Sequence, residues 1–111
     1  MNNLHIGLAC NLGASTSILV SKMQAIVEQS EKLADKNIKI ESFPASQINK
    51  SIQDFDIVLL APQIAHRKDE IGQLAAQYHV PVETINAQDF GAMNAAGILK
   101  EALYIIHSLK S

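Results

Sequence analysis

The side chain best suited to covalent chemistry in this sequence is Cys10, the only cysteine among the 111 residues. The backbone N–H groups of a tight loop, with the positive end of a helix that follows it, bind anions such as phosphate. The same groups favour the thiolate form of a cysteine, which is the nucleophilic form. We therefore predict that Cys10 accepts a phosphoryl group, held by the small and hydroxyl-bearing segment that follows: Asn11, Leu12, Gly13, Ala14, Ser15, Thr16 and Ser17.

Two simpler interpretations of this segment stay open on its composition alone. Gly, Ser and Thr are common turn and helix-capping residues. A lone cysteine is most often a small buried hydrophobic residue. What favours the chemical interpretation is the position of Cys10 in the predicted fold.

Strand and helix patterns alternate along the chain. Short apolar or alternating runs predict strands at 4–9, 38–43, 56–61 and 80–85. Apolar residues at helical spacing predict helices at 15–34, 64–78 and 95–109, with a short turn at 87–93 and a helical turn around Ile48 and Ile52 within 45–55. Because right-handed crossovers join neighbouring strands in this order, we expect an α/β fold with a parallel sheet.

The composition of each strand predicts its place in the sheet. The segments 4–9 and 56–61 are largely apolar and belong in the centre, whereas 38–43 alternates and 80–85 contains Pro81, as edge strands do. We predict one domain over 1–111, a small flavodoxin-like three-layer sandwich with a four-stranded parallel sheet of order 2-1-3-4 and helices on both faces. Ligands bind such sheets outside the carboxyl ends of the strands where the order reverses, between strands one and three. Cys10 lies at that point, where we expect it to be exposed to a ligand.

Composition and charge exclude several classes of function. With 48% apolar residues, 18% charged residues and a net charge of -2, the chain has no general attraction to nucleic acid or anionic lipid. It has no apolar run of about 18 residues and no secretory signal pattern, so we expect a cytoplasmic protein. Its single cysteine, and histidines without metal-ligand spacing, predict no metal site, and we expect no cofactor. We expect a monomer, because no long apolar face is left unpaired.

A second group of candidate residues follows the third predicted strand. Pro62, Gln63 and His66 come directly after 56–61, whose carboxyl end lies beside Cys10 in the predicted sheet. We interpret them as one wall of the site. The alternatives are an ordinary helix cap for Gln63 and an exposed helix position for His66.

These residues resemble a known family. The pattern Cys10-x-x-Gly13-x-Ser15-Thr16-Ser17, followed by 19–23, looks like the start of the lactose/cellobiose-type enzyme IIB components of the bacterial phosphoenolpyruvate-dependent sugar phosphotransferase system (PTS). Segments 56–64 and 97–100 are also similar to that family, so the resemblance covers nearly the whole chain. The sequence departs from the family at Ala61, where glycine is frequent, and at His66, where an aromatic residue is frequent. These departures affect the wall of the site and leave the identity of the partners open.

The resemblance implies a phosphocysteine relay. A phosphohistidine on a IIA protein would donate to Cys10, which would pass the phosphoryl group to a sugar bound by the membrane permease IIC. The sugar implied is cellobiose or another β-glucoside, lactose or diacetylchitobiose, selected mainly by IIC. We expect Leu12 and Ala14 to form part of the surface on which donor and permease dock in turn.

Three other functions fit these residues less well. A small cysteine-dependent phosphatase needs the pattern Cys-x5-Arg, whose guanidinium stabilises the transition state, but Thr16 stands at that position. A receiver-like module would have acidic residues after the first strand, where this chain has Cys10 and Asn11. A flavin site would use aromatic stacking surfaces, and the chain has no Trp and only two Tyr.

Overall fold

The computed structural model describes residues 3–10, 14–34 and 36–110. Its strands are β1 (Leu4–Cys10), β2 (Ile38–Pro44), β3 (Ile57–Leu60) and β4 (Val82–Thr84). The α-helices are α1 (Ala14–Gln29), α2 (Glu31–Ala34), α3 (Ile48–Ser51), α4 (Lys68–Ala76), α5 (Ala87–Gly91) and α6 (Ala95–Lys110), and the 3-10 helices are η1 (Ala45–Gln47), η2 (Ile52–Asp54) and η3 (Pro62–Arg67).

The four strands form one parallel sheet in the order β2-β1-β3-β4, which confirms the predicted topology. The burial of each strand explains this order. All four residues of β3 are buried, and β1 is buried except at its second residue, as central strands covered on both faces should be. In β2, by contrast, Lys39 is exposed between the buried Ile38 and Ile40, as in an edge strand.

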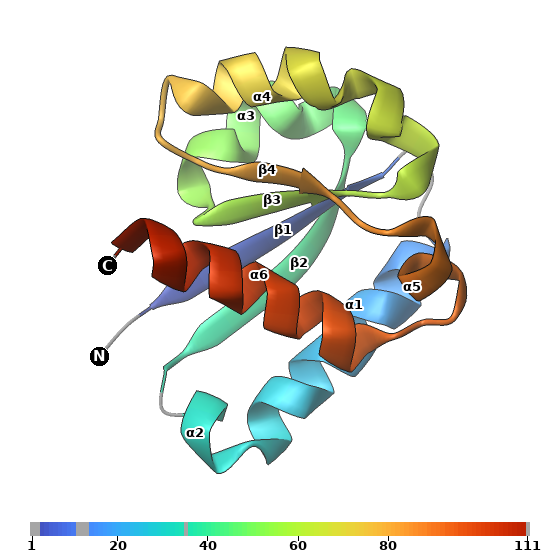
Figure 1. Ribbon diagram of the computed structural model, residues 1–111, viewed down its shortest axis with the longest axis vertical. Helices are drawn as coiled ribbons and strands as arrows, with labels where there is room; N and C mark the ends of the chain where they lie inside the picture. The colour runs from blue at the N-terminus through green and yellow to red at the C-terminus, as the bar shows by residue number, and fades with distance from the viewer. Residues whose placement is uncertain (1–2, 11–13, 35, 111) are drawn as a thin grey trace.

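Helices cover both faces of the sheet, as predicted. In Figure 1, α1 and α6 lie on one side of the sheet and α3 and α4 on the other. The side chains divide in the same way into two buried clusters, which we call the α1–α6 core and the α3–α4 core. Strand β1 contributes Leu4, Ile6, Leu8 and Cys10 to the α1–α6 core, and β3 contributes Val58 and Leu60 to the α3–α4 core.

One close approach on the α3–α4 side depends on a glycine. The rings of Phe43 and Phe55 stack with centroids 5.1 Å apart, and they lie directly over Gly7 of β1. A Cβ atom at Gly7 would lie 2.8 Å from Phe43 and 2.9 Å from Phe55. The two rings therefore occupy the space that any other side chain at this position would need.

Two of the predicted helices are wrong as single helices. The segment 15–34 is interrupted at Ser30, whose Oγ accepts a hydrogen bond from Leu33 N (3.4 Å) and so starts α2 afresh. The segment 64–78 begins in the 3-10 helix η3, where Ile64 has non-helical angles (φ -116°, ψ 22°), and becomes α-helical only at Lys68. The segment 45–55 contains three short helical pieces, η1, α3 and η2, rather than one turn.

Candidate active site

Cys10 is the last residue of β1 and lies at the carboxyl edge of the sheet. It stands opposite Pro44 of β2, and the neighbouring Ala9 accepts a hydrogen bond from Ala61 N at 3.0 Å. The ends of β1 and β3 therefore meet at the predicted switch point. The expectation that Cys10 is exposed there is wrong: the residue is only 6% exposed and belongs to the α1–α6 core. The alternation of side chains along β1 points it toward the face that α1 and α6 cover.

The helix that follows Cys10 begins within a few residues of it. Only the three residues 11–13 separate Cys10 from Ala14, the first residue of α1. The first turn of α1 contains no acidic residue, so no side-chain carboxylate there neutralises the positive end of the helix. The positive end of the α1 dipole therefore begins four residues along the chain from the Cys10 thiol.

The predicted phosphate-binding residues are described only in part. The predictions for Asn11, Leu12 and Gly13, and for the side chains of Ala14 and Ser15, lie outside the described residues. Thr16 is 2% exposed, whereas Ser17 is exposed. Successive residues of a helix point about 100° apart, so these two hydroxyl-bearing side chains lie in different environments.

The predicted wall, made of Pro62, Gln63 and His66, belongs to η3. Its start is fixed by two backbone hydrogen bonds, from Ala61 N to Ala9 O and from Ile64 N to Ala61 O, both 3.0 Å long. Pro62 is half-buried, and Gln63 and His66 are exposed. The exposure of His66 agrees with its alternative interpretation as an ordinary surface residue.

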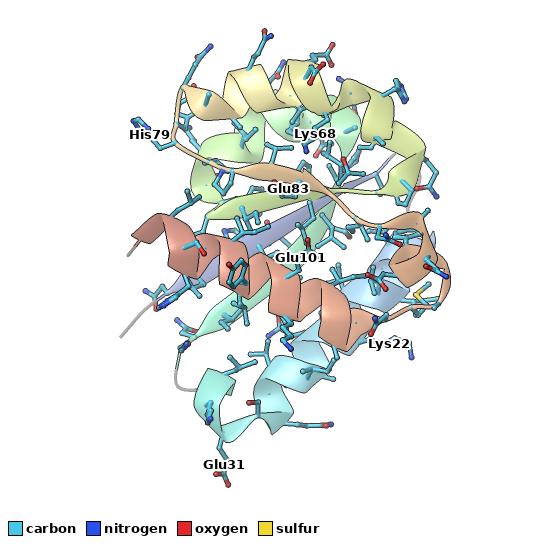
Figure 2. The ribbon with its side chains drawn as sticks, viewed as in Figure 1. Lys22, Glu31, Lys68, His79, Glu83 and Glu101 are labelled. Carbon is cyan, nitrogen blue, oxygen red and sulfur yellow. The ribbon has the colours of Figure 1, made fainter. Side chains whose placement is uncertain are left out.

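Arg67 and Lys68, which directly follow the predicted wall, are each paired with a carboxylate. The Nη2 atom of Arg67, the only arginine in the sequence, lies 2.7 Å from Glu70 Oε1. Figure 2 shows Lys68 of α4 close to Glu83 of β4, and their Nζ and Oε1 atoms are 3.4 Å apart. The arginine that a cysteine-dependent phosphatase needs is thus missing from the segment after Cys10, and the only one present is engaged elsewhere.

A hydrogen-bonded corner between α5 and α6 stands at the same edge of the sheet. Ile85 N donates to Leu60 O (2.8 Å), which brings this segment to the end of β3. Asn86 caps α5 by accepting from Gln88 N (2.8 Å) and Asp89 N (3.2 Å).

Asn94 completes this corner by joining α5 to α6. Its Nδ2 donates to Asp89 Oδ1 (3.1 Å), and its Oδ1 accepts from Gly97 N (3.2 Å). A Cβ atom at Gly97 would lie 2.5 Å from Asn94 Nδ2, so a side chain there would displace the Asn94 carboxamide from this position. The short turn predicted at 87–93 is confirmed by α5. Its two caps were not predicted, although two asparagines, each preceding a helix, are a recognisable capping signal.

No helix in the described part of the chain is long and apolar enough to cross a membrane.

The family model of the PTS lactose/cellobiose-specific IIB subunit matches residues 5–101. The chain is 36% identical over 101 residues to the galactose-specific PTS EIIB component of Lactococcus lactis subsp. cremoris, covering 87% of this chain and 91% of that protein. It has the same identity and coverage with the cellobiose-specific EIIB component of Lactococcus lactis subsp. lactis.

A solved structure is similar over nearly the full length of both chains. The solution structure of the cellobiose-specific phosphotransferase IIB component from Borrelia burgdorferi superimposes with a TM-score of 0.75 at 30% identity, covering 96% of this chain and 94% of that one. The lactose-specific IIB domain from Streptococcus pneumoniae gives the same TM-score at 15% identity and supports the fold alone.

Proposed function

The chain belongs to the lactose/cellobiose-specific IIB subunits of the PTS, which are phosphotransferase components of sugar uptake, and on that premise we propose that it is a phosphocysteine carrier. Cys10 is the carrier residue. The observation that supports this most directly is its position: the only cysteine ends a central strand, and a helix begins three residues later. An electropositive helix end beside a thiolate both activates the sulfur and stabilises the phosphoryl group it accepts.

The proposed transfer has two displacement steps at phosphorus. The Cys10 thiolate attacks the phosphohistidine of IIA in line, so that the S–P bond forms while the N–P bond breaks and the imidazole nitrogen keeps the electron pair. A sugar hydroxyl presented by IIC then attacks the phosphocysteine, the S–P bond breaks and the thiolate is restored. The hydroxyl proton passes to a base on the IIC side. The carrier contributes positioning and charge stabilisation, which carry most of the catalysis in phosphoryl transfer.

We propose that the backbone N–H groups of residues 11–17 bind the phosphoryl oxygens, together with the hydroxyls of Ser15, Thr16 and Ser17. The pairing of Arg67 with Glu70 and of Lys68 with Glu83 supports a site built from neutral donors. Such a site suits a carrier, because the phosphocysteine must last until its acceptor arrives. The phosphatase alternative is disfavoured by the sequence itself, since Thr16 stands where that chemistry needs an arginine.

The proposal extends to the cellular location of the carrier, its two protein partners and its sugar. Residues 1–111 act as one IIB domain, as a monomer in the cytoplasm, docking first with IIA and then with IIC through a surface that includes Leu12 and Ala14. Pro62, Gln63 and His66 form one wall of the site. The sugar is cellobiose or another β-glucoside, lactose or diacetylchitobiose. Relatives named for galactose and for cellobiose are equally similar to this chain, which supports a choice of sugar made by IIC.

Intact-mass spectrometry tests the carrier role. The reduced protein is incubated with phosphoenolpyruvate, the general PTS proteins and a cellobiose-type IIA, in parallel with a Cys10→Ser variant. We expect one phosphoryl group to be added to the wild type and none to the variant, because a serine hydroxyl is not ionised as a thiolate is. Absence of the added mass with several IIA donors, or relay through the serine variant, would refute the proposal.

A further inference from the structure

The side chain of Gln24 joins α1 to the free edge of β2. Its Nε2 donates to Ile38 O and its Oε1 accepts from Ile40 N, both at 3.0 Å. Gln24 is half-buried. Lys22, two residues earlier on the helix, is exposed and points away from the sheet (Figure 2). One carboxamide therefore makes two directional contacts with the backbone of the edge strand.

These two backbone atoms are the pair that a further parallel strand would use. In a parallel ladder, one residue donates to the carbonyl of residue i−1 and accepts from the N–H of residue i+1 on its neighbour. Ile38 O and Ile40 N flank Lys39 in this way. The carboxamide of Gln24 thus stands in for one residue of a fifth strand, and it fixes α1 to the sheet at a defined register.

Helix α1 also packs against the sheet through apolar side chains, whose contacts are less directional. Leu19, Met23 and Val27 of α1 are buried in the α1–α6 core. Hydrophobic burial depends on the area removed from water rather than on direction, so it holds α1 against the sheet but permits small shifts along it. The two hydrogen bonds of Gln24 require aligned donors and acceptors, and they limit such shifts.

The position of α1 matters because the helix starts beside Cys10. Gln24 lies ten residues after Ala14, which is about 15 Å along a stiff helix. Strands β1 and β2 are paired along their whole length, up to Cys10 and Pro44. Fixing α1 to β2 therefore also fixes the start of α1 relative to Cys10. The effect of a helix end on a charge is confined to the first turn and falls off with distance.

We propose that Gln24 is a positioning residue for the Cys10 site: it pins α1 to the edge of β2 and so holds the N-terminus of the helix against the sulfur. This inference deepens the proposed carrier function and rests on it. Gln24 touches neither Cys10 nor the transferred group in this scheme. Its effect passes through the placement of α1.

The test compares Gln24→Met, which keeps the length of the side chain and loses both hydrogen bonds, with Gln29→Met, an exposed position on the same helix. The readout is the rate at which iodoacetamide alkylates Cys10 at pH 7 in the isolated protein, with urea unfolding measured alongside. We expect Gln24→Met to be alkylated about two- to fivefold more slowly than wild type, the range for losing part of a helix-end interaction. Gln29→Met should match the wild type.

The sign of the change separates positioning from a purely structural role. Loosening of the fold would uncover the buried Cys10 and speed alkylation, whereas a displaced helix end slows it by weakening the favourable electrostatic interaction between the helix end and the sulfur. An unchanged or faster rate in Gln24→Met therefore overturns the inference. A second variant, Gln24→Glu, keeps an acceptor for Ile40 N and loses the donor to Ile38 O, and we expect an intermediate rate. It serves as the test if Gln24→Met fails to fold.

Phosphoryl transfer from IIA, followed on the same variants, separates the two proposals. If the wild type accepts no phosphoryl group, the carrier function fails, but the alkylation rates still decide whether Gln24 positions α1. If the wild type is phosphorylated and Gln24→Met accepts the group at the same rate and is alkylated normally, the carrier function stands and the inference about Gln24 is wrong.

Discussion

At the scale of single residues, Gly7 of β1 has no space for a side chain, because two aromatic rings pack over it. The stacked rings of Phe43 and Phe55 fill the volume that a side chain would take. We predict that Gly7→Ala lowers the free energy of unfolding by about 1–3 kcal/mol, as overpacking of a filled core does. Urea denaturation measures the change.

Gly72→Ala is the matched control for this prediction. Gly72 lies in α4, and no atom stands within 4 Å of a Cβ built there. Alanine should therefore stabilise the protein by about 0.5–1 kcal/mol, because it loses less backbone entropy than glycine in a helix. If Gly7→Ala were as stable as the wild type, the rings would have room to move and the packing argument would fail.

Single residues also mark the limit of what the sequence alone could predict at the site. Cys10 is predicted to be the carrier residue from its type and its place after an apolar strand, and this stays a prediction. Its burial was not predicted. Burial depends on which face of β1 the side chain occupies and on the helices that cover that face. The contact of Gln24 with the backbone of β2 was not predicted. Nothing in the local sequence pattern distinguishes a glutamine that hydrogen-bonds to a strand edge from one that is exposed to solvent.

At the scale of elements, the corner between α5 and α6 depends on the cap at Asn94. This side chain satisfies Gly97 N at the start of α6 and also donates to Asp89. We predict that Asn94→Ala destabilises the protein by about 1 kcal/mol, the usual cost of losing an N-cap. Thermal denaturation should show a lower Tm, while substitution of the exposed Asn49 in α3 by alanine should leave Tm almost unchanged. Equal Tm values for the two variants would contradict a capping role.

The elements were predicted well where the pattern is regular and poorly where a local interaction breaks it. The difference in burial between β1 and β2 follows from their apolar and alternating sequences, so the strand order could be derived. The break at Ser30 depends on a serine hydroxyl that caps α2, without the glycine or proline that usually signals a helix end. The 3-10 start of η3 depends on the angles of Ile64, which periodicity does not reveal.

At the scale of the whole molecule, the sheet separates a face that includes Cys10 from a face that does not. Met23 lies fully buried in the α1–α6 core, and Ile71 is 1% exposed in the α3–α4 core. We predict that Met23→Ala and Ile71→Ala each cost about 2–5 kcal/mol in unfolding free energy, as other large-to-small core changes do. Only Met23→Ala should also slow phosphoryl acceptance from IIA, because it loosens α1.

Urea unfolding and the rate of mass gain, measured under conditions where both variants remain folded, test this separation. A slowed transfer in Ile71→Ala equal to that in Met23→Ala would show that the two faces act on Cys10 alike. The separation would then carry no functional meaning.

The single sulfur of Cys10 bears on the order of events in the proposed relay. The residue is only 6% exposed, and its one sulfur can carry one phosphoryl group at a time. In that relay IIA and the permease would use the same site in turn, and transfer would follow a double-displacement cycle in which IIA departs before the permease arrives. The rate at which IIA charges the carrier would then not depend on the concentration of the sugar.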